Sequence, residues 1–255
     1  MERRFLKIIV FTSLLITSCQ QIPINESNKN FVDDNVDEQN LVIDLKKQEK
    51  IISYHSDIWS YILVNSTHTS DTLDEQTLMY MNRHLQDLDK FKEFLNDSYY
   101  FIFFVIEELE NAKLPIELAF LPYIESNYDP FSISSSGAVG MWQFMPRTGR
   151  TYDLDRSWWN EDRHDPFKST TAAIKYLKYL YERFDQDLYL TLAAYNAGPS
   201  FLDRQIKKNQ RRGLNTDYWS LDLPIQTRNY VPKFIAIKEL IINSDQYDIE
   251  LPFIP

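Results

Sequence analysis

The stretch LPYIESNYDP, residues 121–130, places a single carboxylate at the end of an apolar run. Glu125 follows the side chains of Tyr123 and Ile124, and a turn is expected directly after Ser126. Apolar surroundings disfavour the ionised form of a carboxyl group and so raise its pKa. A carboxyl group with a pKa near neutrality can deliver a proton to a leaving oxygen and later take one back. Glu125 is therefore the first candidate for a general acid and base.

Three more strings stand out further along the chain. They are GAVGMWQFMPRTG from Gly137, LAAYNAGP from Leu192 and TRNYVPKF from Thr227. Each string alone has an ordinary structural interpretation. A Glu-Ser pair often ends a solvated helix, an aromatic MWQF is often part of a core, and AYNAG is typical of a helix that runs into its C-cap. The function is therefore judged from the four strings together.

In this order and at these spacings, the four strings resemble the lytic transglycosylases with an SLT-type catalytic domain, in the lysozyme-like superfamily. The chain is most similar to the membrane-bound D-type members. The resemblance covers residues from about 113 to about 240 and includes the linking text RHDPFKSTTAAIKYLKYL. It implies a lysozyme-like α-helical domain that cleaves peptidoglycan glycan strands.

The same resemblance assigns roles to individual residues. Glu125 matches the catalytic acid/base. The second motif is normally Gly-Leu-Met-Gln and here reads Gly-Met-Trp-Gln, so Gln143 matches a sugar contact, whereas Trp142 takes the place of the usual methionine. Which residue packs against the acetamide group is therefore left open. The residues expected to bind substrate are Ser126, Met141, Trp142, Gln143, Tyr195, Asn196 and Tyr230.

The implied reaction breaks the β-1,4 bond between N-acetylmuramic acid and N-acetylglucosamine without water and leaves a 1,6-anhydromuramic end. A hydrolase with two carboxylates would need a second acid. Asp129 precedes Pro130 in a turn, where Asp is a common structural residue, and Asp153 matches no catalytic position of the family. One acid suffices if the sugar's own C6 hydroxyl attacks C1, since a tethered nucleophile has an effective molarity of about 10⁵ M or more when aligned.

Two alternatives remain open from the sequence. The same fold could end in hydrolysis, as in a goose-type lysozyme, which would give a product one water heavier. The chain could also be an inactive, lipid-anchored glycan-binding protein. The presence of Glu125 argues against this second alternative.

Composition excludes several other classes of site. The chain has only 5 glycines and contains no GxxxxGK, GxGxxG or G-x-S-x-G string. The four histidines show no HExxH or paired spacing, so neither a metal nor a cofactor is expected. The net charge of −10 disfavours a nucleic-acid partner, which would need clustered Lys and Arg. The histidines are His55, His68, His84 and His164.

The N-terminus has the pattern of a lipoprotein signal. Arg3, Arg4 and Lys7 precede a short apolar run, and ITSC then ends at Cys19, the only cysteine of the chain. The string resembles a lipobox, so we expect a signal peptide over 1–18, lipidation of Cys19 and a polar tether over 19–40. A lipid anchor holds a domain on a membrane without a spanning helix. Gln20 after the cysteine favours an outer membrane lipoprotein that faces the periplasm. Protein partners cannot be named.

Apolar residues at three- and four-residue spacing predict helices along most of the chain, and no segment alternates at a period of two for long. The expected fold class is mainly α, with a lysozyme-like catalytic domain over 113–255. An additional N-terminal helical region over 41–112 is expected to pack on it. D-type relatives often carry LysM modules after the catalytic domain, and none is expected here.

Within the N-terminal region a helix is predicted over 45–64, and another from near Asp74. A third, over 98–113, is expected to be buried nearly all round. The second helix is expected to place four apolar residues on one face: Leu78, Met81, Leu85 and Leu88.

In the catalytic region, Pro115 is expected to start a helix and Pro122 to bend it. A short helix over 138–152 is expected to stop near Pro146. Further helices are predicted at the C-terminal side. They cover 169–184 with Ser/Thr caps, 188–199 and 225–242.

Overall fold

The computed structural model describes residues 57–66 and 73–254. The chain divides into two units, Met1–Asp44 and Leu45–Pro255, and every described residue belongs to the second. The expected signal peptide over 1–18 and tether over 19–40 lie outside the described residues. The same holds for the predicted start of the first helix, and for Cys19, His55 and His68.

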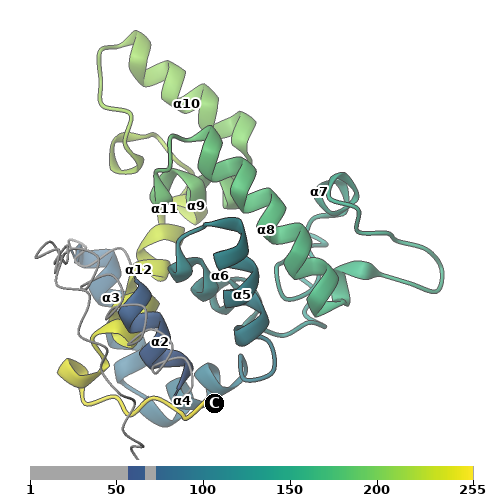
Figure 1. Ribbon diagram of the computed structural model, residues 1–255. Helices are drawn as coiled ribbons and strands as arrows, with labels where there is room; N and C mark the ends of the chain where they lie inside the picture. The colour runs from purple at the N-terminus through teal and green to yellow at the C-terminus, as the bar shows by residue number, and fades with distance from the viewer. Residues whose placement is uncertain (1–56, 67–72, 255) are drawn as a thin grey trace, which may run out of the picture. The chain divides into compact units, whose positions relative to one another are not determined.

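The described part of the second unit is built from helices (Figure 1). Isolated β-bridges pair Ile133 with Val139, Val139 with Phe144, and Arg156 with Glu161. The prediction of a mainly α-helical protein is therefore confirmed. The α-helices are α2 Ile58–Asn65, α3 Glu75–Leu85, α4 Leu88–Asn96, α5 Ile102–Ala112, α6 Leu121–Ser126, α7 Pro146–Thr151, α8 Pro166–Arg183, α9 Leu188–Ala197, α10 Pro199–Arg211, α11 Ile225–Arg228 and α12 Tyr230–Ile242. The 3-10 helices are η1 Ile116–Phe120, η2 Asp162–His164, η3 Tyr218–Ser220 and η4 Ser244–Tyr247.

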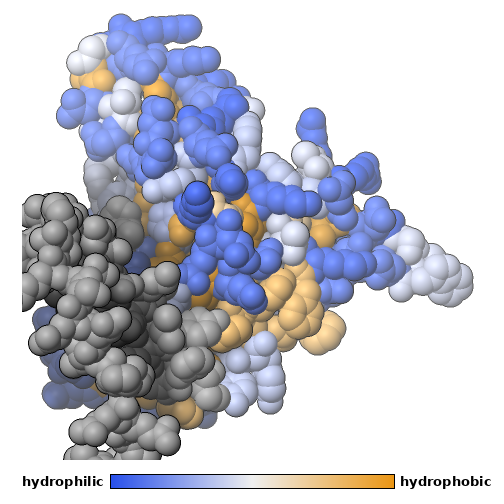
Figure 2. All heavy atoms as spheres, in the orientation of Figure 1, coloured by the Kyte–Doolittle hydropathy of each residue, from blue (hydrophilic) through white to orange (hydrophobic). Residues whose placement is uncertain are grey.

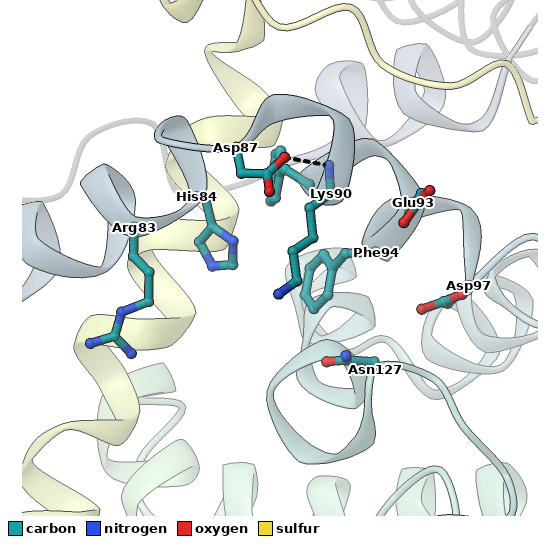
Figure 3. Close-up of a pocket in the computed structure, with 9 residues that line it drawn as sticks. Arg83, His84, Asp87, Lys90, Glu93, Phe94, Asp97 and Asn127 are labelled. Atoms are coloured by element: carbon teal, nitrogen blue, oxygen red, sulfur yellow. Dashed lines mark hydrogen bonds between the residues drawn. The ribbon is translucent and has the colours of Figure 1, made fainter.

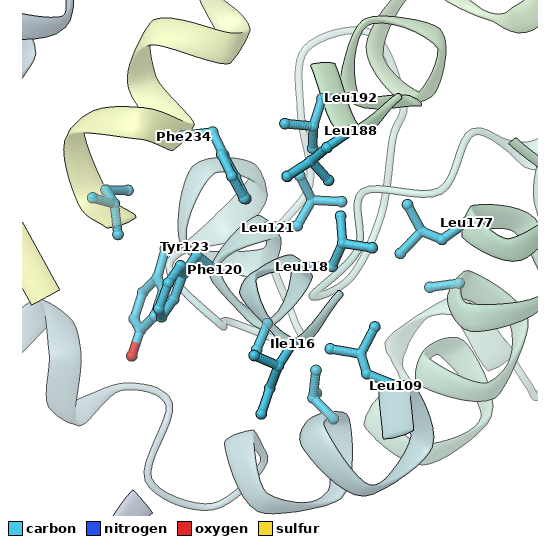
Figure 4. Close-up of a cluster of buried hydrophobic side chains, with 14 of the residues drawn as sticks. Leu109, Ile116, Leu118, Phe120, Leu121, Tyr123, Leu177, Leu188, Leu192 and Phe234 are labelled. Atoms are coloured by element: carbon cyan, nitrogen blue, oxygen red, sulfur yellow. The ribbon is translucent and has the colours of Figure 1, made fainter. Parts of the chain in front are cut away.

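The core surrounds η1 and α6. Leu118, Phe120 and Leu121 are fully buried there, and α5, α8, α9 and α12 pack around them (Figure 4). Burial of a large apolar side chain stabilises the fold by about 1.5–3 kcal/mol. The core therefore fixes α6, the short helix that carries Glu125, between four longer elements.

The elements before residue 113 contact the helices that follow. Helix α3 packs along α12, and α5 packs along α8. The N–H of Ile58 donates to the carbonyl of Ile254 at 2.9 Å, and the indole of Trp59 donates to the carbonyl of Pro252 at 2.6 Å. These bonds join α2 to the C-terminal segment.

Two predictions for the N-terminal helices were wrong in detail. Helix α3 buries Thr77 and Tyr80. Met81 is also buried and Leu85 is partly buried, as predicted, but Leu78 is 44% exposed and Leu88 begins α4. Asp87 causes this break, because its carboxylate caps the first turn of α4. Helix α5 is buried on one side only, since Phe103 is 40% exposed and Glu107 faces solvent.

Two prolines act differently from the prediction. Pro122 lies in the first turn of α6, directly after η1. A backbone N–H at this position has no partner within the helix, so the N–H that proline lacks costs no hydrogen bond. Pro122 does not bend a helix from within. Pro146 begins α7 rather than ending a helix, and the residues before it form a turn and a β-bridge.

The C-terminal helices follow the prediction more closely. The helix predicted over 169–184 starts earlier, at Pro166, because the carboxylate of Asp165 caps it in place of a Ser or Thr. Helix α9 ends at Gly198 as predicted, with φ +85°. The last predicted helix is divided at Asn229 into α11 and α12.

Helix α10 was not predicted. Its surface is strongly hydrophilic (Figure 2), and only Leu202 and Asn209 are buried along it. Among the described residues, no helix combines the length and the apolar character that crossing a membrane requires.

Candidate active site

Glu125 occupies the last turn of α6, and the chain reverses directly after Ser126. Asn127 and Tyr128 both adopt left-handed backbone conformations, with φ of +58° and +61°. The hydroxyl of Tyr128 donates to the carbonyl of Ala119 at 2.6 Å, and its ring is fully buried. The turn is thereby held against η1, and it leaves the Glu125 carboxyl at the end of an apolar helix, as predicted.

The Glu125 carboxyl is partly open to solvent but is surrounded by groups that desolvate it. Burial raises its pKa to about 7, while a hydrogen bond from Tyr230 and the charge of Lys233 oppose the rise. The phenol of Tyr230, in the first turn of α12, donates to Oε1 of Glu125. Burial and the neighbouring carboxylate raise the pKa of Tyr230 well above its usual range, so the phenol remains a donor. This environment therefore allows Glu125 to carry a proton near neutral pH.

The second motif is held by its backbone carbonyls. The hydroxyl of Ser126 donates to the carbonyl of Met141 at 2.8 Å, and that of Tyr195 donates to the carbonyl of Trp142 at 2.8 Å. Both bonds start from residues of other motifs. The loop is therefore fixed from α6 on one side and from α9 on the other.

The side chains of Met141 and Trp142 are fully buried. The indole N–H of Trp142 donates to Oγ1 of Thr170 on α8 at 2.9 Å. Both side chains therefore lie in the core, and the two residues meet the rest of the site through their backbone.

Gln143 is half-buried and has φ +49°. Its side-chain amide donates to the carbonyl of Gly140 at 2.8 Å and to that of Ser132 at 3.3 Å. Gly140 has φ +83°, and a Cβ there would lie 1.8 Å from the carbonyl oxygen of Arg163. Only glycine fits this position.

The third and fourth motifs are joined by side chains. Thr227 is buried, and its hydroxyl donates to Oδ1 of Asn196 at 2.9 Å. Asn196 itself is half-buried in the last turn of α9. Tyr230 thus contacts the Glu125 carboxyl directly. The hydroxyls of Ser126, Tyr195 and Thr227 link the strings to one another.

The two other carboxylates considered from the sequence have structural partners. Oδ1 of Asp129 accepts the backbone N–H of Phe131 at 2.8 Å. The side chain of Asp153 is 89% exposed and lies 3.9 Å from Lys175. Neither is among the groups that shift the pKa of Glu125.

The described histidines are also engaged elsewhere. His84 packs against Phe91 and Phe94, and Nδ1 of His164 lies 2.7 Å from the carbonyl oxygen of Pro130. Within residues 57–66 and 73–254, no group of three or more His, Cys, Asp or Glu side chains is placed to hold a metal ion.

Sequence reasoning missed three residues that shape the site. Thr227 and Lys233 lie in the TRNYVPKF string, where only Tyr230 was singled out. Arg163 is buried, and its guanidinium donates to the carbonyl of Phe144 at 2.8 Å and to both oxygens of Glu161. A basic residue in the linking text RHDPF was the available signal, but nothing in the sequence indicates that it supports the second motif.

Residues 104–217 match the family model described as "Transglycosylase SLT domain". Membrane-bound lytic murein transglycosylase D of Escherichia coli (strain K12) is 35% identical over 208 residues, which cover 79% of this chain and 44% of that protein. A putative tributyltin chloride resistance protein of Alteromonas sp. (strain M-1) is 37% identical over 106 residues, covering 42% of this chain and 51% of that protein.

A solved structure of an inactive mutant of lytic transglycosylase Slt from Pseudomonas aeruginosa aligns with a TM-score of 0.48 and 19% identity, covering 86% of this chain and 35% of that one. The chain spans about half the length, or less, of the curated relatives described above. Glu125, the second motif and the Tyr195–Asn196 pair all lie within the matched residues, and Tyr230 lies beyond them. Over residues 104–217 the chain therefore matches the transglycosylase SLT domain family, which confirms the resemblance given by its motifs.

Proposed function

We propose that this protein is a lytic transglycosylase that cleaves the β-1,4 bond between N-acetylmuramic acid and N-acetylglucosamine in peptidoglycan. The observation that supports this proposal most is the Glu125 carboxyl, whose pKa is raised to about 7 and which lies within the residues that match the SLT domain model. The relatives named as membrane-bound lytic murein transglycosylases support the substrate class.

In the first step, Glu125 is the general acid. Its Oε1 accepts the hydrogen bond of Tyr230, so Oε2 would carry the proton. The bond from C1 of muramic acid to the bridging oxygen breaks, and this proton passes to that oxygen as N-acetylglucosamine leaves. The substrate's own N-acetyl carbonyl would stabilise the positive charge that develops at C1.

In the second step, Glu125 is the general base. The C6 hydroxyl of the same muramic acid attacks C1 and gives its proton to the carboxylate, which restores the acid for the next cycle. The product is a 1,6-anhydro ring, and no water is consumed. A tethered hydroxyl competes well with water when it is aligned, because its effective molarity is about 10⁵ M or more.

The placement of other carboxylates supports this single-acid reaction over hydrolysis. The charged group that acts on the Glu125 pKa is a cation, Lys233, and the carboxylate of Asp129 is occupied by a backbone N–H. Asn196 would bind sugar through its NH₂ group, because its carbonyl oxygen is taken by Thr227. Gln143 would use its side-chain oxygen, because its NH₂ group is taken by backbone carbonyls.

Ser126, Met141, Trp142 and Tyr195 would then shape the substrate site through the bonds that hold the second motif, while Tyr230 orients the acid. This division of roles refines the sequence assignment, which expected all of these residues to bind substrate.

Digestion of purified peptidoglycan followed by mass spectrometry tests the reaction. We expect 1,6-anhydro muropeptides as the main product, no digestion by Glu125→Gln, and normal products from Asp153→Asn, a matched control at an exposed carboxylate. Reducing-end products, one water heavier, would replace this proposal with hydrolysis. Normal digestion by Glu125→Gln would show that the catalytic assignment is wrong.

We further propose that the protein is an outer membrane lipoprotein facing the periplasm, with a signal peptide over 1–18, lipidation at Cys19 and a tether over 19–40. The helical region over 41–112 and the catalytic domain over 113–255 would follow. The membrane-bound relatives support this. Labelling of cells with a radioactive fatty acid should mark the wild type but not Cys19→Ser, and a labelled Cys19→Ser protein would contradict it.

A further inference from the structure

A pocket lies between α3, α4 and the end of α6 (Figure 3). It has a volume of about 380 Å³, and we call it the α3–α4 pocket. Aromatic rings form its floor. His84 lies 4.9 Å from Phe91 and 5.5 Å from Phe94, measured between ring centroids, and these contacts fix the shape of the pocket.

Two cations lie on one side of the α3–α4 pocket. Arg83 comes from α3 and Lys90 from α4, and both side chains are exposed (Figure 3). Among the described residues, neither forms an ion pair with a carboxylate. The nearby carboxylate of Asp87 accepts the backbone N–H of Lys90 at 3.0 Å as a helix cap. This side of the pocket is therefore suited to an anionic group.

Two carboxylates lie on the other side. Glu93 lies on α4, and Asp97 follows its last residue in a helical conformation, so the two carboxylates, four residues apart, lie on the same side and repel each other. Burial, Asp129 and Glu93 all raise the pKa of Asp97. Within the described part of the chain, no cation pairs with either carboxylate. A cationic ligand group would relieve this repulsion, and the pocket as a whole is suited to a molecule that carries both charges.

The α3–α4 pocket does not include Glu125, but two of its lining residues connect to it. Asn127, which lines the pocket, is two residues beyond Glu125 in the chain, so their Cα atoms lie within about 7 Å of each other. Tyr80 provides a second connection. The guanidinium of Arg83 lies 5.4 Å from its ring centroid and the ammonium of Lys233 5.5 Å, and Lys233 is the cation that acts on Glu125.

We propose that the α3–α4 pocket binds the peptide that is attached to muramic acid in the strand held at Glu125. Arg83 and Lys90 bind carboxylates of this peptide, Glu93 and Asp97 bind its free side-chain amine, and the aliphatic stem between them lies on Phe94. A peptide extends by about 3.5 Å per residue, so a few of its residues span the separation of Asn127 from Glu125.

This inference rests on the proposed function for the identity of the strand, but its test does not depend on catalysis. The probe is the tripeptide N-acetyl-L-Ala-γ-D-Glu-diaminopimelate, whose alanine nitrogen is an amide as in the attached peptide, titrated calorimetrically into the Glu125→Gln protein. Two modified probes separate the charges: one also has its side-chain amine acetylated, and the other has amidated carboxylates. Lys90→Gln and Asp97→Asn each remove one charge from the pocket. Lys92→Gln is the matched control, since it lies on the same helix and pairs with Glu250 at 3.2 Å.

The tripeptide should bind, and both modified probes should bind at least tenfold more weakly. Lys90→Gln should weaken binding of the tripeptide at least fivefold but leave binding of the amidated probe unaffected. Asp97→Asn should likewise weaken binding of the tripeptide at least fivefold but leave binding of the probe with the acetylated side-chain amine unaffected. Lys92→Gln should bind as the parent protein does. Absence of binding, equal affinity for all three probes, or an equal loss in Lys92→Gln would overturn the inference. The proposed activity, tested by the products of digestion, would stand or fall separately.

Discussion

Replacing Tyr230 with Phe isolates the hydrogen bond that acts on the Glu125 carboxyl. The phenol donates to Oε1 of Glu125 and stays protonated, because its own pKa lies well above the usual range. A donated hydrogen bond stabilises the carboxylate more than the carboxylic acid, and so it lowers the pKa of Glu125 against the effect of burial. Removing the hydroxyl should therefore raise this pKa above its value of about 7.

The size of the effect follows from the strength of the bond. A hydrogen bond to a charged group contributes about 1.5–3 kcal/mol, and one pKa unit corresponds to about 1.4 kcal/mol. Tyr230→Phe should thus raise the Glu125 pKa by about one to two units. At pH 7 the protonated fraction of Glu125 would rise from about one half to about nine tenths or more. The general acid is then retained to higher pH, although the carboxyl loses the bond that orients it.

The measurement is the pH dependence of kcat/KM on a soluble glycan fragment, whose alkaline limb reports the acid of the free enzyme. The limb should move to higher pH by about one to two units in Tyr230→Phe. Tyr195→Phe is the control, because its hydroxyl donates to the carbonyl of Trp142 at 2.8 Å and not to Glu125. A limb that stays in place, moves to lower pH, or moves equally in both variants would refute the reasoning.

Three further predictions concern stability. Gly140→Ala should be less stable than Gly137→Ala in urea denaturation by at least about 2 kcal/mol: both glycines have φ near +84°, but only at Gly140 would the new Cβ lie 1.8 Å from a carbonyl oxygen. Equal losses would contradict this. Arg163→Lys should lower the free energy of unfolding by about 1–3 kcal/mol, because lysine cannot reproduce the two-pronged pairing with Glu161 at 2.7 and 2.8 Å; an unchanged Tm would count against it. Glu125→Gln should raise Tm at pH 8 but have little effect at pH 4. Since the folded-state pKa of Glu125 is raised from 4.5 to about 7, its stabilising effect is complete below pH 4.5 and is lost as the pH rises through 7. The gain at pH 8 is at most about 3 kcal/mol, and equal gains at both pH values would exclude this cause.

Helices with long, regular apolar spacing could be predicted from the sequence, whereas their boundaries at prolines could not. The segments that form α8 and α9 carry apolar residues at helical spacing over several turns, so the helix is predicted even where single residues would also fit a loop or strand. Proline is compatible both with the first turn of a helix and with the residues just beyond its end. At Pro122 and Pro146 the local sequence allows either, and the surrounding fold decides.

Helix α10 was missed because few apolar side chains pack it on the core, namely Leu202 and the partly buried Phe201 and Ile206, and a polar side chain anchors its end. The amide of Asn209 donates to the carbonyls of Asn215 and Ser220 at 2.8 and 2.9 Å, and so it holds the loop that follows. A prediction from the spacing of apolar residues takes no account of a polar side chain such as that of Asn209. A lysine- and arginine-rich surface also hides the one buried apolar residue, Leu202.

The direction of a side chain was equally beyond the sequence. Trp142 was expected to contact sugar, because it replaces the methionine of the usual motif. The structure buries it, and its partner Thr170 is 28 residues away on α8. No local pattern states which face of a loop will meet which helix, so the motif could locate the loop but not the role of each side chain in it.

The four strings are informative together because each one binds the next. Ser126 joins the first string to the second, the Tyr195 hydroxyl joins the third to the second, Thr227 joins the fourth to the third, and Tyr230 returns from the fourth to Glu125. Three of these four bonds start from a hydroxyl whose acceptor lies at least 31 residues away, so a single string carries no sign of its partner. A closed set of bonds also predicts that loosening one contact will disturb the position of the acid through the others. This explains why the resemblance becomes specific only when all four strings occur in order.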